Sequence, residues 1–163
     1  MSTHSNLSDY DPNAIPDSKD LKVGIVVSQW NSDITESLYY GAYNTLIKCS
    51  VNKDNIKRID VPGSFELIHG SKLMINSNVD VVIAIGCVIQ GETKHFDYVC
   101  QSVANGIAQL NTLYKIPVVF CVLTDNNKQQ SIDRSGGKFG NKGIESAITA
   151  IKLGNLANWF KVC

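Results

Sequence analysis

The sequence predicts an α/β fold, a single-domain, three-layer αβα sandwich around a flavodoxin-like, doubly wound parallel sheet. Two runs, 79–89 and 116–124, consist almost wholly of apolar and largely β-branched residues. Such runs are typical of strands that are covered on both faces. Between them, apolar residues recur at helical spacing, and strands that alternate with helices favour a parallel sheet. The length of 163 residues fits one domain.

The elements alternate along the chain. Residues 1–20 are polar, contain two prolines and are expected to form an extended or disordered arm, whereas 21–163 form the α/β domain. The domain is expected to begin with a strand at 21–28, followed by a helix that Asp33 caps. The pattern then predicts a strand at 56–63, a helix at 65–76, the strand at 79–89, a helix through 99–110, the strand at 116–124 and a last helix from 144 toward 159.

Composition excludes several classes of partner. Lys and Arg number 15 and so do Asp and Glu, so the formal net charge is zero. Proteins that bind nucleic acids or anionic membranes usually need a basic surface, so neither partner is expected. No apolar run reaches the roughly 18 residues of a membrane span. The five cysteines are scattered without a CxxC pair, which indicates reduced thiols and a cytoplasmic protein.

Ligands of such sheets bind outside the carboxyl ends of the strands, so the segments that follow the strands carry the candidate site. After the first strand, Trp30 can stack on a planar ring; the alternative is an aromatic side chain at the edge of the core. After the second strand, Ser64 is expected to cap the next helix, which leaves backbone N–H groups free for a ligand. The alternative for Ser64 is a capped helix and nothing more.

The third and fourth strands are followed by candidates for anion binding and proton transfer. Gly91 permits a tight loop, Thr93 offers a hydroxyl at a predicted helix start, and His95 can move protons near neutral pH. Arg134 is a candidate phosphate ligand, because a guanidinium pairs with phosphate through two hydrogen bonds. The alternative for His95 is a surface histidine that caps a helix. The alternative for Arg134 is a solvated charge on a helix. The glycines and two lysines that follow Arg134 resemble a phosphate-binding loop, but the segment GKFGNKG (137–143) fits neither a Walker motif nor GxGxxG.

The sequence lacks the motifs of metal-dependent and nucleophilic catalysis. The chain has no CxxC or His cluster for a metal, no HExxH and no nucleophile elbow. The remaining groups suit a reaction whose substrates carry their own nucleophile and electrophile. The protein would then act mainly by orienting its substrates.

Four motifs carry a resemblance to a known family: GIVVSQWN, VPGSFEL, GCVIQGETKHFDYVC and IDRSGGKFGNKGIESA. In this order they resemble the lumazine synthases over about residues 22–155. The resemblance implies condensation of 5-amino-6-(D-ribitylamino)uracil with 3,4-dihydroxy-2-butanone 4-phosphate. The product is 6,7-dimethyl-8-ribityllumazine, formed with phosphate and water in the penultimate step of riboflavin biosynthesis. It implies an enzyme, a transferase, with no cofactor and no metal.

The resemblance also assigns roles to individual residues. His95 is the expected proton-transfer residue and Trp30 stacks on the pyrimidine. The other expected substrate contacts are Ser64, Phe65 and Glu66 at the ribityl-uracil, Cys87, Val88 and Ile89 in the uracil pocket, Glu92 and Thr93 at the phosphate turn, Arg134 as phosphate anchor and Phe120 from a neighbouring subunit.

Two positions depart from the family pattern. Gln90 stands where Arg or Lys is common, and Glu92 stands where a small residue is usual. A carboxylate would repel phosphate, so the Glu92 side chain is expected to turn away while its backbone N–H binds. Lys138 or Lys142 is a candidate to offset its charge.

Assembly follows from the resemblance as well. It implies a homo-pentamer with sites between subunits, and the short segment 136–143 resembles that of members forming a 60-subunit icosahedral capsid. The arm is then expected to add a strand to a neighbour's sheet, and riboflavin synthase is a candidate partner. Two alternatives stay open: a non-catalytic flavin-binding shell protein, and an archaeal-type riboflavin synthase of the same fold. The combination of Trp30, His95 and Arg134 argues against the first.

Overall fold

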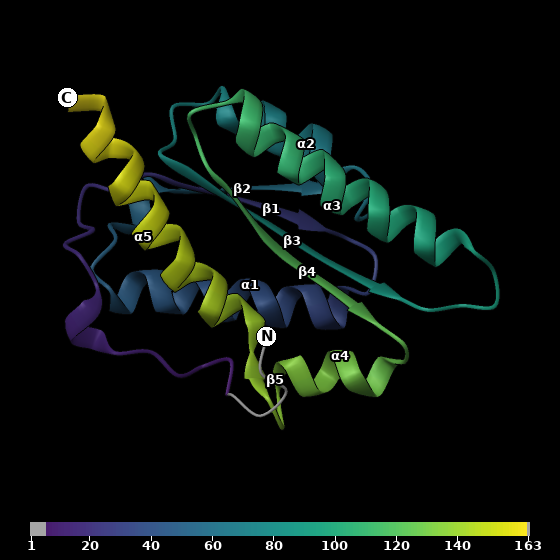
Figure 1. Ribbon diagram of the computed structural model, residues 1–163. Coiled ribbons are helices and arrows are strands. Elements are labelled where there is room, and N and C mark those ends of the chain that lie inside the picture. The colour runs from purple at the N-terminus through teal and green to yellow at the C-terminus, as the bar shows by residue number, and fades with distance from the viewer. Residues whose placement is uncertain (1–5, 163) are drawn as a thin grey trace.

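A parallel four-stranded sheet in the order β2–β1–β3–β4 forms the middle layer of the molecule (Figure 1). The computed structural model describes the backbone of residues 6–162 and the side chains of residues 6–160. The sheet comprises β1 (Val23–Ser28), β2 (Ile56–Val61), β3 (Val81–Ile89) and β4 (Val118–Asp125). From β1, the sheet grows to one side with β2 and then to the other side with β3 and β4, as in doubly wound folds. The predicted fold class is confirmed.

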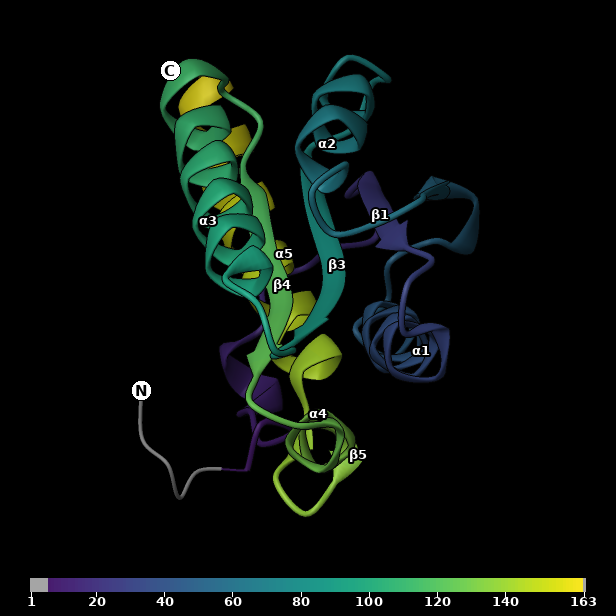
Figure 2. The same cartoon turned by 90° about the vertical axis from the view of Figure 1, so that its right-hand side faces the viewer.

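Helices cover both faces of this sheet. One face packs against α1 (Ser32–Lys48) and α5 (Lys142–Val162), and the other against α2 (Leu67–Ile75) and α3 (His95–Leu113). After β4, the chain forms α4 (Lys128–Arg134) and a small antiparallel pair, β5 (Ser135–Gly137) with β6 (Gly140–Asn141). Figure 2 shows α4 and β5 beyond the end of β4. Two 3-10 turns, η1 (Pro12–Ala14) and η2 (Lys53–Asn55), complete the elements.

The core has two halves because each strand presents alternate residues to opposite faces. On β1, Val23, Ile25 and Val27 join the half under α1 and α5, whereas Val26 joins the half under α2 and α3. Every residue of β1 is buried. Val81–Cys87 of β3 are buried as well, so the apolar run 79–89 marks a strand that is covered on both faces, as predicted. The run 116–124 is covered less completely, because Phe120 and Thr124 of β4 are exposed.

The predicted start of the first long helix was wrong by two residues. Its N-cap is Asn31, in the left-handed conformation (φ 57°, ψ 47°), and α1 begins at Ser32. Asp33 lies in the first turn of α1, where a carboxylate interacts favourably with the helix dipole. Its carboxylate also pairs with Lys128 Nζ at 2.8 Å. The helix α4 and the pair β5–β6 are additions to the predicted elements.

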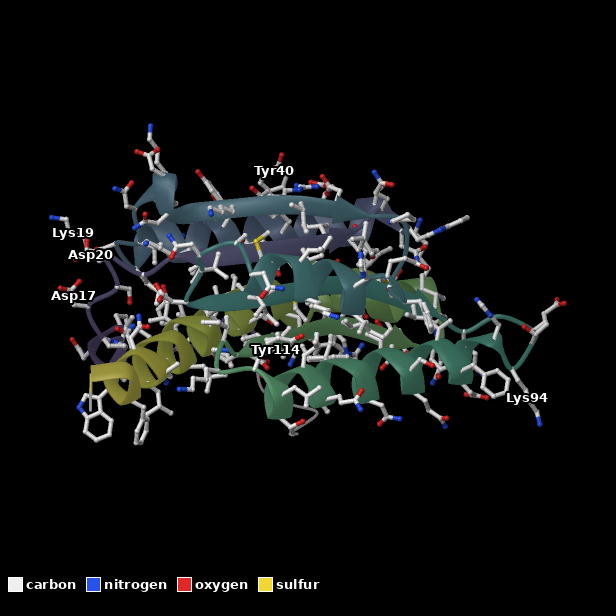
Figure 3. All side chains as sticks on the ribbon, turned by 90° about the horizontal axis from the view of Figure 1, so that it is seen from above. Asp17, Lys19, Asp20, Tyr40, Lys94 and Tyr114 are labelled. Carbon is white, nitrogen blue, oxygen red and sulfur yellow. The ribbon has the colours of Figure 1, made fainter. Side chains whose placement is uncertain are left out.

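The predicted arm, 1–20, begins in residues outside the described part of the chain. From residue 6 onward it runs over its own domain: Leu7 N–H donates to the Phe139 carbonyl at 2.8 Å, and Asn141 N–H donates to Ser8 Oγ at 3.0 Å. These bonds tie the arm to the β5–β6 pair. In Figure 3, Asp17, Lys19 and Asp20 of the arm lie at the opposite end of the molecule from Lys94, which precedes α3.

Candidate active site

A cavity of about 690 Å³ opens at the carboxyl ends of β1, β2 and β3. The segment after β1, the turn after β2, the end of β3 and the first two turns of α3 form its wall. It lies where open α/β sheets bind their ligands. Eight residues predicted from the sequence line it: Trp30, Ser64, Phe65, Glu66, Cys87, Val88, Ile89 and His95.

The turn after β2 brings an aromatic ring and a carboxylate together. Gln29 N–H donates to the Val61 carbonyl at 2.9 Å and Trp30 N–H to the Pro62 carbonyl at 3.2 Å, which joins the exits of β1 and β2. A Cβ on Gly63 would lie 2.9 Å from Glu66 Oε2 and 3.2 Å from Trp30 Cδ1. Glycine is therefore what lets both side chains approach this turn. The Trp30 side chain is 72% exposed, so it offers a face to a planar ligand.

Ser64 does not cap the following helix, so this prediction was wrong. The helix α2 begins at Leu67 without a side-chain cap, and only the Ser64 carbonyl is used, accepting from Leu67 N–H at 3.2 Å. The Ser64 hydroxyl is buried and has no hydrogen-bond partner among the described residues. An unsatisfied buried hydroxyl costs about 1–3 kcal/mol.

The floor of the cavity is the end of β3. Asn31 Nδ2 donates to the Cys87 carbonyl at 3.0 Å. Asn31, the N-cap of α1, therefore also holds the end of β3 in place. The Cys87 thiol donates to Ser131 Oγ at 3.4 Å. Burial raises the pKa of the Cys87 thiol to about 11, so it is protonated at neutral pH. Cys87 therefore suits a lining role and not a nucleophilic one, since the thiolate is the nucleophile.

The start of α3 carries the histidine. His95 is the first residue of α3, and its backbone N–H donates to Thr93 Oγ1 at 3.3 Å. Neither Glu92 nor Thr93 lines the cavity, although both precede α3 and are exposed. Figure 3 shows the neighbouring Lys94 pointing away from the body of the molecule.

Five further residues that the sequence did not identify line the cavity: Asn31, Gly63, Tyr98, Val99 and Ser102. Tyr98 and Ser102 follow His95 at three and seven positions, so all three lie on one face of α3. This helical spacing was the signal available for them.

Arg134 and Phe120 lie away from the cavity of their own chain. Arg134 ends α4, donates from Nη1 to the Gln130 carbonyl at 3.0 Å, and its guanidinium carbon lies 5.1 Å from the centre of the Phe139 ring. Phe120 lies on β4, where its side chain is 37% exposed. Both side chains are therefore accessible at the surface, where a second molecule can meet them.

The two lysines considered beside Glu92 have other partners. Lys142 pairs with the Glu145 carboxylate one turn along α5, and Lys138 Nζ lies 5.3 Å from the centre of the Phe139 ring. Among the side chains that the structure describes, those of residues 6–160, no group of three or more His, Cys, Asp or Glu is placed to hold a metal ion. No helix within residues 6–162 is long and apolar enough to cross a membrane.

The fold and the cavity define a flavodoxin-like α/β protein with an open cavity at the carboxyl edge of its sheet, where such sheets bind their ligands. A family model for 6,7-dimethyl-8-ribityllumazine synthase matches residues 20–158. A relative of that name from Flavobacterium johnsoniae is 64% identical over 151 residues, 92% of this chain and 80% of the relative. Those from Christiangramia forsetii (58%, covering 93% and 92%) and Parabacteroides distasonis (51%, covering 94% and 97%) agree. The chain belongs to the 6,7-dimethyl-8-ribityllumazine synthase family.

Proposed function

We propose that this protein is a lumazine synthase. It condenses 5-amino-6-(D-ribitylamino)uracil with 3,4-dihydroxy-2-butanone 4-phosphate to 6,7-dimethyl-8-ribityllumazine and releases phosphate and water. One observation supports this beyond family membership: eight residues expected to bind these substrates surround one cavity. The substrates bring their own amine nucleophile and ketone electrophile. Orientation can then lower the barrier by about 7–11 kcal/mol in favourable cases.

Each lining residue has a role in this proposal. The exposed Trp30 ring stacks on the pyrimidine, and the turn Ser64–Glu66 binds the ribityl-uracil. Cys87, Val88 and Ile89 form the uracil pocket, largely through their backbone groups, and the Cys87 thiol beside them stays neutral. His95 transfers protons between the amine and the carbonyl as the new C–N bond forms.

The phosphate site requires groups that lie outside this cavity. Glu92 and Thr93 supply backbone N–H groups, and Arg134 anchors the phosphate. Because Arg134 and Phe120 do not line the cavity of their own chain, we assign both to the cavity of an adjacent copy. A cyclic homo-pentamer would complete each site in this way, since its heterologous interfaces join two different surfaces.

Assembly, location and partners extend the proposal. The short connection 136–143 supports packing of pentamers into a 60-subunit capsid. The four cysteines described, Cys49, Cys87, Cys100 and Cys121, are free thiols, which supports a cytoplasmic location. Riboflavin synthase is the proposed partner that receives the product.

A rate measurement tests this function. Purified protein is mixed with both substrates, and lumazine absorbance is followed against a mixture without protein. We expect the protein to accelerate lumazine formation, with a rate that saturates as the concentration of each substrate rises. A rate equal to the uncatalysed condensation would refute it, and flavin binding without acceleration would then identify the non-catalytic alternative. Solution mass measured in parallel distinguishes a monomer, a pentamer and a capsid.

A further inference from the structure

A buried carboxylate lies behind the proposed phosphate anchor. Asp125 is the last residue of β4, and after a short loop α4 doubles back beside the end of this strand (Figure 1). Asp125 is 7% exposed. A buried carboxylate is costly unless it is paired and hydrogen-bonded, and an apolar residue would serve the core equally well. The partners of Asp125 therefore indicate what it does.

One carboxylate oxygen is fixed by hydrogen bonds. Asp125 Oδ2 accepts from Ser131 Oγ at 2.8 Å, and Ser131 is completely buried. Ser131 Oγ in turn accepts from the Cys87 thiol at 3.4 Å. The Asp125 carbonyl accepts from Gln90 N–H at 2.9 Å, so its backbone is held as well. This chain of contacts leads from the cavity wall at Cys87 to a carboxylate whose orientation is set.

The other carboxylate oxygen faces the guanidinium. Asp125 Oδ1 lies 3.8 Å from Arg134 Nη1, which is an ion pair without a hydrogen bond. The Phe139 ring and the Gln130 carbonyl contact the same guanidinium. Among the described residues, only Nη1 of Arg134 makes a hydrogen bond, so Nε and Nη2 stay available. Phosphate binds a guanidinium best through two parallel N–H groups.

We propose that Asp125 is a positioning residue that holds the Arg134 guanidinium in its phosphate-binding orientation. Ser131 fixes the carboxylate, and the carboxylate fixes the guanidinium. This inference rests on the proposed function, because it acts through the phosphate-anchoring role of Arg134. Asp125 itself does not touch the substrate.

The substitution Asp125→Asn tests this role, because it keeps the shape and an acceptor for Ser131 but removes the charge. The KM for 3,4-dihydroxy-2-butanone 4-phosphate is expected to rise about five- to tenfold, the usual effect of losing one charged contact. The kcat and the KM for the uracil substrate should stay within about twofold. Ser131→Ala should raise the same KM by a smaller factor.

Asp133→Asn is the matched control. Asp133 also lies on α4 and loses the same charge, but its carboxylate accepts from Gln129 Nε2 at 2.9 Å and forms no ion pair in the described part of the chain. Its KM for the phosphate substrate should be unchanged. In an Arg134→Ala background, Asp125→Asn should add nothing, because a positioning residue acts only through the group it positions.

Three results would overturn the inference. They are an unchanged KM in Asp125→Asn, a lowered KM, as expected if the carboxylate only repels phosphate, and an equal rise in the Arg134→Ala background. Titration with inorganic phosphate supplies a second readout that needs no turnover. An inactive wild-type protein would refute the proposed function. Weaker phosphate binding by Asp125→Asn would then still support the positioning role, and equal binding would refute it.

Discussion

A single methyl group at Gly86 is expected to disturb both the core and the cavity. Gly86 lies in β3, and a Cβ there would lie 2.7 Å from Ser64 Oγ and 2.8 Å from Leu67 Cδ1. Ordinary contacts of a Cβ begin at 3.4 Å, so each neighbour must move by more than half an ångström. Leu67 is fully buried and Ser64 is 6% exposed, so neither side chain has free space. Overpacking of this kind typically costs about 1–3 kcal/mol.

The same displacement reaches the active site. Ser64 begins the turn that continues through Phe65 and Glu66 into the cavity wall. A shift of about 1 Å in a positioning group can cost on the order of 10²-fold in rate. For Gly86→Ala we therefore expect a loss of roughly tenfold or more in kcat/KM for the uracil substrate, beside the loss of stability. Urea unfolding and initial rates of lumazine formation measure the two effects.

Gly91→Ala is the control for stability. Gly91 has no positive φ, and a Cβ added there would meet no heavy atom within 4 Å. Its free energy of unfolding should stay within about 0.5 kcal/mol of the wild type. Equal stability of Gly86→Ala and Gly91→Ala would refute the close packing of β3 against the turn.

Three further predictions concern charge and protonation. Arg134→Ala should chiefly raise the KM for the phosphate substrate, and steady-state kinetics with an unchanged KM would refute the anchoring role. His95→Ala should slow turnover, by less than the roughly 10²–10⁴-fold typical of general acid–base catalysis because solvent can substitute; a wild-type kcat would remove His95 from the mechanism. Burial raises the pKa of the Cys87 and Cys121 thiols from 9.0 to about 11. The unfolded state therefore loses these protons first, and stability should fall between pH 9 and 11 by up to about 1.4 kcal/mol per pH unit for each thiol. Urea unfolding across that pH range tests this, and Cys121→Ala should flatten the slope.

The larger elements were predictable because their signals are local. Covered strands consist of unbroken apolar runs, and the observed strands agree with the predicted ones to within two residues. The short helix α4 is polar and the β5–β6 pair is glycine-rich, so neither has a periodic apolar pattern. The two wrong caps have tertiary causes. The side chain of Asn31, the residue before α1, donates to the Cys87 carbonyl of β3, and the Ser64 hydroxyl lies against Gly86 of β3 instead of capping α2.

The sequence predicted those parts of the cavity wall that follow directly from the ends of the strands. The carboxyl ends of parallel strands meet at one edge, so the segments after β1, β2 and β3 had to converge. The contact of Asp125 with Arg134 depends on how α4 turns back, which no spacing rule gives. The location of Arg134 outside the cavity of its own chain was not predicted either, because the sequence places the segment after the fourth strand at the same edge of the sheet as the other three.

Subunit mixing tests most directly the claim that each active site combines two copies. A cavity variant, Trp30→Ala/His95→Ala, and an anchor variant, Arg134→Ala, are unfolded, mixed in equal amounts and refolded together. If each site takes its cavity from one subunit and Arg134 from the next, random assembly leaves about a quarter of the sites with both parts intact. The mixture should then reach about a quarter of the wild-type rate at low concentration of the phosphate substrate. A mixture no more active than the two variants refolded separately would contradict it.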